Sequence, residues 1–255
     1  MICIDDSNNF KVLAAIYSFY DRFLKGFSPA CRPGCHVCCT VNIVATSLEA
    51  GYLLRSSFFD NLDLKKLLHS ATARPIYRPS LSTNQIADLC LRQEEVPSDS
   101  VEHGEGFCPF LDREGLCNVY EHRPFACRAM SSREVCQYGG EADMEPFLVT
   151  VNLAVYQIIE HLDKEGVSGN LLDVLSELEN NRFESPGTVN GLISNRALPG
   201  FLVSPNEQVR FRAFLRCLTD FKVGDTTLGA FLGQYIRPTS TSQPGSGQSK
   251  SQAIQ

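Results

Sequence analysis

The sequence contains no tryptophan, only three methionines among 255 residues, and no excess of positive charge. Its 23 lysines and arginines are outnumbered by 29 aspartates and glutamates, which gives a formal net charge of -6. A chain of this charge has no general electrostatic attraction to nucleic acid or to anionic lipid. We therefore expect no nucleic-acid partner and no membrane partner. A protein partner or a protein substrate is left open, as is the oligomeric state.

The sequence also lacks a long hydrophobic run. Its most apolar stretch, residues 147–159, is interrupted by Thr150, Asn152 and Gln157. This stretch is shorter than the roughly 18 residues that a membrane-spanning helix needs. The first six residues do not show the basic segment followed by an apolar segment that is typical of a secretory signal. Together these absences predict a cytoplasmic protein.

Motifs for common cofactors and nucleophiles are missing as well. We find no G-x-G-x-x-G after a strand, no G-x4-G-K-[ST], no H-E-x-x-H and no G-x-S-x-G. No nucleophile signature surrounds any cysteine. The sequence therefore indicates no nucleotide-binding site, and the catalytic residues of any enzyme activity stay unknown.

Cysteine, in contrast, is abundant and clustered. Eight of the eleven cysteines fall in two short windows, residues 31–39 and residues 108–136. In a reducing compartment, clustered cysteines are more often metal ligands or redox groups than a disulfide framework. Thiolate sulfur is a soft ligand, which selects zinc, copper(I) or iron–sulfur clusters. The predicted metal ligands are Cys31, Cys35, Cys38, Cys39, Cys108, Cys117, Cys127 and Cys136.

The spacing of these cysteines bears on the kind of metal. Cys38 and Cys39 are adjacent, so their side chains are expected to point in different directions. They would serve two metals, or two irons of one cluster, more easily than one mononuclear site. Paired C-x2-C knuckles, which would favour zinc, are missing. The spacing therefore favours an iron–sulfur cluster, with zinc as the alternative cofactor. If the cofactor is a cluster, we expect the 4Fe-4S type.

The residues around the cysteines resemble a known family. The order C-x3-C-x2-C-C, then Cys-Pro-Phe-Leu at 108–111, Gly-Leu-Cys-Asn-Val-Tyr at 115–120 and Arg-Pro-Phe-Ala-Cys-Arg at 123–128, is similar to the bacterial cysteine-cluster family of zinc- or iron-chelating domains, the CxxCxxCC type. The similarity covers residues 28–140, and Cys136 matches a less constant downstream cysteine. It also extends to the cysteine-rich segment of flagellin lysine N-methylases, which is thought to hold an iron–sulfur cluster. The resemblance implies that the eight cysteines are ligands.

Three functions are consistent with these observations. The first is a metal-binding protein that holds an iron–sulfur cluster or zinc through clustered cysteine thiolates for redox chemistry or sensing. The second, implied by the resemblance alone, is a flagellin-type protein-lysine N-methyltransferase. The third is a structural zinc module, in which residues 142–236 present a helical surface for protein interaction.

The rest of the chain has a helical pattern. Apolar residues recur at offsets of three and four between residues 8 and 26, and residues 46–49 resemble a capping box that opens a helix through residue 54. Further helices are predicted over 62–69, 84–94, 145–161, 171–178, 205–221 and 228–236, with 145–161 and 171–178 forming an αα-hairpin. The predicted fold class is mainly α with irregular cysteine-rich loops.

We expect a small metal-stapled α domain with a C-terminal helical extension. Residues 1–140 would form the cysteine-cluster metal-binding domain, with its core at 28–140. Residues 141–236 would form a helical extension packed on that domain. Residues 237–255 have too little apolar material to offset the entropy of ordering, so we expect a disordered tail.

Other residues in and near the windows are secondary candidates. Four arginines could donate hydrogen bonds to thiolate sulfur or else pair with Asp112, Glu114 or Glu121: Arg32, Arg123, Arg128 and Arg133. His36 and His122 could each replace a cysteine in a Cys3His zinc site. Cys90 and Cys217 occur in helical apolar patterns and are predicted to be buried small hydrophobes, while Cys3 lies at a terminus expected to be mobile.

Overall fold

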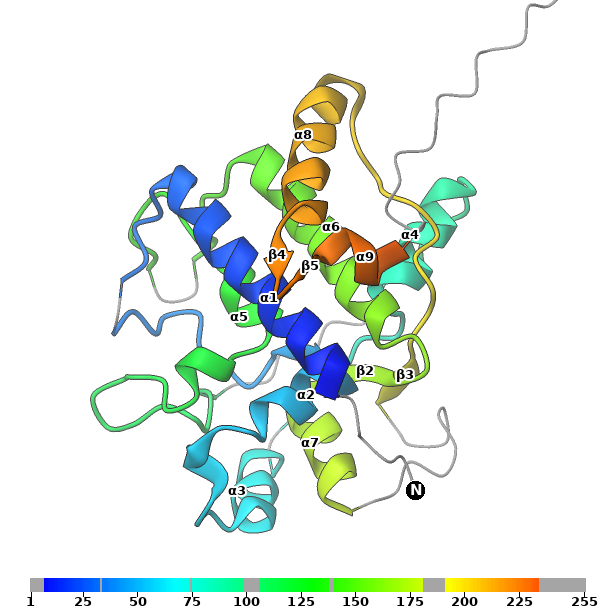
Figure 1. The fold of residues 1–255 in the computed structure, drawn as a ribbon. Coiled ribbons are helices and arrows are strands. Elements are labelled where there is room, and N and C mark those ends of the chain that lie inside the picture. Colours follow the sequence, from blue (N-terminus) through cyan, green and yellow to red (C-terminus); the bar gives the residue numbers. More distant parts are fainter. Residues whose placement is uncertain are drawn as a thin grey trace, which may run out of the picture.

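The computed structural model describes residues 7–32, 34–73, 75–98, 106–137, 140–180 and 191–233. Over these residues about half of the chain is helical, with nine α-helices and a few short strands, so the predicted mainly α class is confirmed (Figure 1). Cys3 and the predicted tail at 237–255 lie outside the described residues.

The described helices match the periodicity of the sequence closely. The eight predicted helices correspond to all of those found except α5. The helices are α1 (Ser7–Leu24), α2 (Ser47–Leu53), α3 (Leu64–Ala71), α4 (Thr83–Leu91), α5 (Phe125–Ala129), α6 (Pro146–Leu162), α7 (Leu171–Asn180), α8 (Gln208–Thr219) and α9 (Leu228–Leu232). The strands are β1 (Val44–Thr46), β2 (Val167–Asn170), β3 (Leu192–Ser194), β4 (Lys222–Val223) and β5 (Thr226–Thr227).

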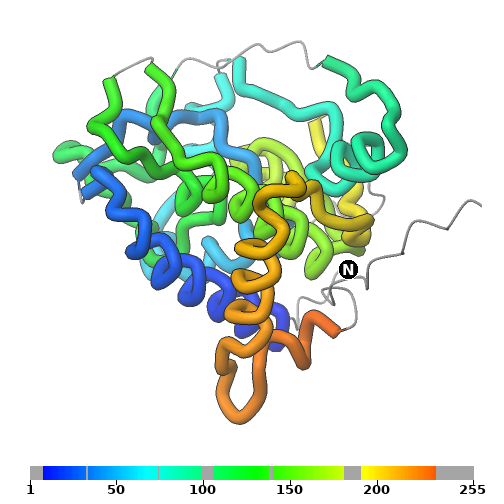
Figure 2. The backbone as a smooth tube through the Cα atoms, turned by 90° about the horizontal axis from the view of Figure 1, so that it is seen from above, coloured from blue at the N-terminus to red at the C-terminus, as the bar shows by residue number. Residues whose placement is uncertain are grey.

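The first hydrophobic core lies between α1, α6, α8 and α9. Leu13 and Ile16 of α1, Val151 of α6 and Leu218 of α8 are fully buried in it. Aromatic rings also meet there, since Phe19 of α1 lies 5.7 Å from the Phe214 ring of α8. Figure 2 shows α9 and one end of α8 next to α1, although the segments are far apart in the sequence.

The second core lies on the other side of the molecule, where α2, α3 and α7 pack around a small sheet. The sheet has the order β1-β2-β3 and is antiparallel throughout, with Ala45 opposite Gly169 and Ser168 opposite Ile193. Strand β1 begins five residues after the first cysteine window, so its pairing with β2 ties that window to the C-terminal half of the chain.

The predicted αα-hairpin of 145–161 and 171–178 is wrong. The residues between the two helices form strand β2, and α7 packs against α2 and α3, whereas α6 contacts α4. The strand is held by neighbours from distant parts of the sequence, which local periodicity does not reveal. A side chain at Gly169 would lie 2.8 Å from the Gly191 carbonyl oxygen, so the close approach of β3 requires glycine there.

Each core contains residues from both sides of the predicted boundary between residues 140 and 141. Whether residues 1–140 fold independently of 141–236 stays a prediction. None of the described helices combines the length and the hydrophobicity that crossing a lipid bilayer requires.

Candidate metal centre

The two cysteine windows meet through backbone pairing. The Cys108 N–H donates to the Cys39 carbonyl at 3.0 Å, and the Val41 N–H donates to the Gly106 carbonyl at 3.2 Å. Between these bonds, Thr40 and Phe107 form an antiparallel bridge. Paired backbones lie about 5 Å apart. The end of the first window is therefore a direct neighbour of the start of the second.

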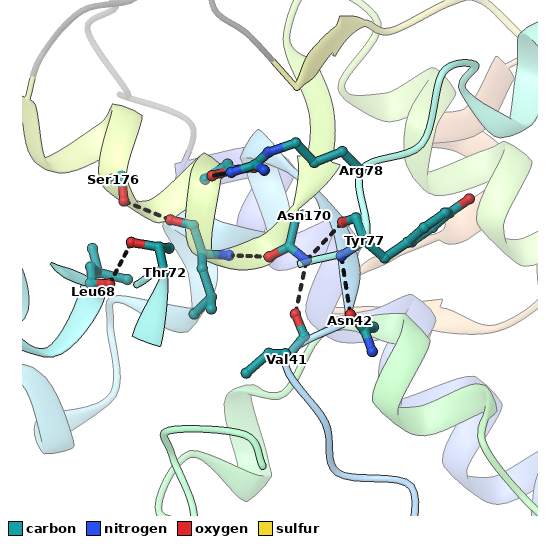
Figure 3. Close-up of polar contacts among 10 residues, drawn as sticks. Val41, Asn42, Leu68, Thr72, Tyr77, Arg78, Asn170 and Ser176 are labelled. Carbon is teal, nitrogen blue, oxygen red and sulfur yellow. Dashed lines mark hydrogen bonds and ion pairs between the residues drawn. The ribbon is translucent and has the colours of Figure 1, made fainter. Parts of the chain in front are cut away.

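The buried side chain of Asn170 holds the segment that follows the first window (Figure 3). Its amide nitrogen donates to the Val41 carbonyl at 2.8 Å and to the Tyr77 carbonyl at 3.0 Å. The Tyr77 N–H in turn donates to the Asn42 side chain at 3.1 Å. Asn170 lies at the end of β2 and has no exposed surface. One amide from the C-terminal half thus positions the chain that leaves the first window.

A tight turn brings Cys117 back toward Cys108. Leu111 and Cys117 form a bridge across this turn. The Asp112 carboxylate accepts two backbone N–H groups inside it, at 2.9 and 2.8 Å. Gly115 has a φ of 79°, a left-handed conformation that glycine adopts without strain. The local sequence alone therefore brings these two cysteines together.

Cys127 lies in α5, and Glu49 fixes the start of that helix. The buried Glu49 carboxylate accepts from the Phe125 N–H at 2.7 Å and from the Tyr17 hydroxyl at 2.8 Å. It also completes the predicted capping box of α2 by accepting from the Thr46 N–H at 3.0 Å. Burial raises the pKa of Glu49. One side chain thus joins α1, α2 and α5, and it fixes the position of Cys127 relative to these helices.

Five cysteines form one group at this junction. The Cys127 thiol lies within electrostatic range of Cys38, Cys108 and Cys117, and the Cys39 thiol lies within range of Cys108 and Cys127. Three of the five also pack against the second core. We call this group the inner cysteines: Cys38, Cys39, Cys108, Cys117 and Cys127.

Backbone N–H groups point at two of the inner sulfurs. The Phe110 N–H donates to the Cys108 thiol, and the Val119 N–H donates to the Cys117 thiol. Each donor lies two residues after its cysteine. Hydrogen bonds of this kind favour the thiolate over the thiol and tune sulfur as a metal ligand. At Cys108 and Cys117 these hydrogen bonds partly oppose the rise in pKa that burial causes.

The inner thiols carry an electrostatic cost that a cation would relieve. Burial raises the pKa of Cys108 to about 11, and it also raises the pKa of Cys117 and of Cys127. Neighbouring thiols raise the pKa of Cys127 further, and the Arg123 guanidinium opposes this effect. A bound cation would replace the protons on these sulfurs, because metal ligation requires thiolate.

Cys38 and Cys39 do not point apart as expected. Their thiols are hydrogen-bonded to each other, which lowers the pKa of Cys38 and raises that of Cys39. The tight turn explains the difference, since the Cys39 N–H donates to the His36 carbonyl at 3.0 Å and the Thr40 N–H donates to the Cys38 carbonyl at 3.1 Å.

The other three predicted ligands lie beside the inner group, since the Cys31 thiol is within electrostatic range of Cys38. Cys31, Cys35 and Cys136 line a cavity of about 400 Å³. Cys31 and Cys35 are exposed to solvent, and Cys136 is partly exposed. The Cys31 thiol accepts a hydrogen bond from the Ser132 N–H and lies within electrostatic range of Cys35 and Cys136. We call these three the outer cysteines.

The arginines act differently from one another. Arg123 stacks 3.7 Å from the centre of the Tyr120 ring, and its charge opposes the rise in the pKa of Cys117 and Cys127. Arg128 is buried and pairs with Asp21 at 2.6 Å, and Arg133 pairs with Asp143 at 2.6 Å. These two arginines form ion pairs with carboxylates other than the ones predicted. The two pairs connect the second window to α1 and to the segment before α6. Arg32 lines the cavity of the outer cysteines.

The remaining candidates are also placed by the structure. Cys90 and Cys217 are exposed on α4 and α8, so the prediction that they are buried is wrong. On α8 the apolar residues Phe214 and Leu218 face the core and Cys217 faces solvent, whereas on α4 the apolar Ile86 and Leu91 are exposed together with Cys90. His122 lies against the Tyr52 ring at 5.1 Å, and His36 lines the cavity of the outer cysteines.

Among the residues that the structure describes, no three His, Cys, Asp or Glu side chains are close enough to enclose a metal ion. The donors nevertheless fit zinc or iron in their chemistry, since they are gathered thiols with N–H groups directed at sulfur. The set of eight ligands stays a prediction.

Fold and site together define a mainly helical protein with a thiol-rich region. Residues 30–144 match the model of the family described as "Putative zinc- or iron-chelating domain", CxxCxxCC. This match confirms the resemblance and supports a metal-binding role. Neither the comparison with curated proteins nor the comparison with solved structures found a match.

Proposed function

We propose that this protein holds an iron–sulfur cluster at its inner cysteines and uses it for redox chemistry or sensing. The observation that carries the proposal is the gathering of five thiols from two distant windows on one side of the second core. When bound, the cluster would supply one-electron chemistry. The chain would supply the thiolates, the N–H groups that stabilise them and the positive charge of Arg123.

The arrangement of the inner cysteines supports a cluster over a single zinc ion. One zinc ion takes four ligands at the corners of a tetrahedron, and the inner group holds five thiols, two of them on adjacent residues. In a cluster, separate irons can each take one thiolate, so Cys38 and Cys39 need not share a metal. The second core covers one side of the group, which limits the access of water to it.

Anaerobic purification followed by quantification of iron, zinc and sulfide tests this proposal. We expect a brown protein that contains iron and sulfide in similar amounts. Replacing Cys127 by serine should lower the iron content, and the matched Cys217→Ser variant should retain it, because Cys217 is exposed on α8. A preparation with full iron content in Cys127→Ser would contradict the assignment of the site.

The same preparation separates the two alternatives. A colourless protein with stoichiometric zinc would indicate the structural zinc module for protein interaction. Incubation with labelled S-adenosylmethionine and cell extract tests the protein-lysine N-methyltransferase, which predicts transfer of label to a protein. If no protein becomes labelled, the chain lacks this enzyme activity, and the metal-binding function is unaffected.

A further inference from the structure

We infer that the outer face of α8 is a docking surface for an acidic segment of a partner protein. This face carries Val209, Arg212 and Arg216, which we call the α8 basic row. The inference goes beyond the proposed function, because α8 packs in the first core, whereas Cys108 and Cys127 of the inner group pack against the second core. Its test therefore does not depend on the metal.

Helix α8 buries one side and exposes the other. Val209, Arg212 and Arg216 are exposed, and they follow one another at offsets of three and four, the spacing that aligns side chains along one face of a helix. Figure 2 shows α8 at the front of the chain, with no other described segment drawn in front of it. The side chains that the helix buries in the first core are Phe211, Phe214, Leu215 and Leu218.

The α8 basic row is positive in a chain that is acidic overall. The chain has 29 acidic and 23 basic residues, yet α8 contains three arginines and no aspartate or glutamate. Arg210 forms an ion pair with Glu145. Arg212 and Arg216 form no ion pair with a carboxylate among the residues that the structure describes. Arg212 instead donates to the Gln208 side chain at 3.2 Å. The positive charge of the row is therefore available to a partner.

The three residues of the row stabilise the free helix poorly. Arg212 and Arg216 lie four residues apart, and like charges at this spacing destabilise a helix. Val209 is 80% exposed, more than any other large hydrophobic side chain of the described residues, and β-branched residues are weak helix formers. The carboxylates of a bound partner would relieve the repulsion between the arginines, and an apolar side chain beside them would cover Val209.

The chemistry of the row favours an acidic protein segment over nucleic acid. A planar guanidinium can pair with both oxygens of one carboxylate, and arginine is enriched at protein interfaces. Asp220 is exposed directly after α8, so the positive face ends at Arg216. Nucleic acid binding depends on many phosphate contacts, which two arginines in a chain of net charge -6 do not supply. The fitting partner is a helix with carboxylates one turn apart and an apolar neighbour.

The test uses the full chain and three fluorescent probes, with binding read by anisotropy at low and at moderate salt. The first probe is a synthetic helical peptide that carries one leucine and two glutamates on one face at offsets of three and four. The second has glutamine in place of both glutamates, and the third is a double-stranded DNA oligonucleotide. The variant is Arg212→Glu with Arg216→Glu. Its matched control is Lys65→Glu with Lys66→Glu, the same change of charge at exposed positions of α3.

We expect the glutamate peptide to bind the unaltered chain and the α3 control with similar affinity. The α8 double variant should bind it at least about tenfold more weakly, because like charges would then face each other. The glutamine peptide should bind more weakly than the glutamate peptide, and added salt should weaken binding by screening the charges. Hydrogen exchange with the glutamate peptide bound should slow in α8. All variants should keep the metal content of the unaltered chain.

Several results would overturn the docking surface. No binding of the glutamate peptide at low salt would do so, as would equal binding by the α8 double variant or by the glutamine peptide. Tighter binding of the DNA would assign the row to nucleic acid. Self-association of the unaltered chain that the double variant abolishes, without peptide binding, would assign it to a second copy. If every preparation binds the peptide at α8 but lacks metal, only the proposed function fails.

Discussion

The first core and the cysteine windows are held together by different means. In the first core, fully buried apolar and aromatic side chains from α1, α6 and α8 contact one another. The windows have mostly turns, one short helix and thiols that remain partly exposed. The first core therefore has its stabilising interactions within the chain, whereas we expect the windows to depend on a bound metal. The following predictions test this difference, beginning with the largest expected effect.

Removing the metal should affect the windows far more than the first core. Structural thiolate sites contribute about 10 to 16 kcal/mol in zinc peptides, as much as the stability of a whole domain. After chelation we expect fast exchange of the backbone amide hydrogens within residues 28–140, except at residues that pack in the first core, such as Phe125 and Ala129. Helices α6 and α8 should stay protected. Exchange measured by mass spectrometry checks this, and equal loss of protection in α8 and in the windows would contradict it.

Leu13→Ala should destabilise the protein to the same extent with and without metal. Leu13 is fully buried in the first core, and such truncations cost about 2 to 5 kcal/mol because they leave a cavity. Urea unfolding of both forms gives the two values. The matched control is Val209→Ala on α8, where the side chain is 80% exposed and little change is expected. A lower metal content in Leu13→Ala would show that the two regions are coupled.

Asn170→Ala probes the contact between the second core and the first window. The change leaves the carbonyls of Val41 and Tyr77 without their side-chain donor, and an unsatisfied buried group costs about 1 to 3 kcal/mol. We expect lower stability together with weaker metal retention. Metal content after dialysis provides the second measurement. Asn180→Ala, at the exposed end of α7, is the control that should change neither quantity.

The smallest expected effect is a pH dependence from His161 in α6. Burial lowers the pKa of His161, and its Nδ1 accepts from the Leu198 N–H at 3.2 Å. Below its ordinary value of about 6.5 the unfolded chain takes up a proton that the folded chain resists. The contribution to stability is therefore present above about pH 6.5 and is lost as the pH falls through the lowered pKa.

Urea unfolding of the metal-free protein at several pH values measures this slope. The metal-free form is used because thiolate ligands bind protons in acid and would add their own dependence. His161→Gln should flatten the slope below neutrality. An unchanged slope in this variant would assign the effect to other groups.

Much of the candidate site follows from local sequence. The turn with Asp112 and Gly115 brings Cys117 to Cys108, and the Thr46 to Glu49 capping box forms as its residues indicate. The exposure of Cys90 was not predictable in this way, because an apolar pattern does not show on which side of the helix a small residue lies. The second role of Glu49, which holds α5, also depends on a helix far away in the sequence.

The sequence by itself determined eight of the nine described helices, the two cysteine windows and the resemblance of residues 30–144 to the chelating domain, because periodicity and spacing are local properties of the chain. Only the tertiary structure decided that the residues between α6 and α7 form a strand and that the cysteines divide into inner and outer groups. Both outcomes depend on hydrogen bonds between distant segments, such as Cys108 to Cys39 and Ala30 to Ser132. Such pairings form when the cores pack, and one segment read alone contains no sign of its partner.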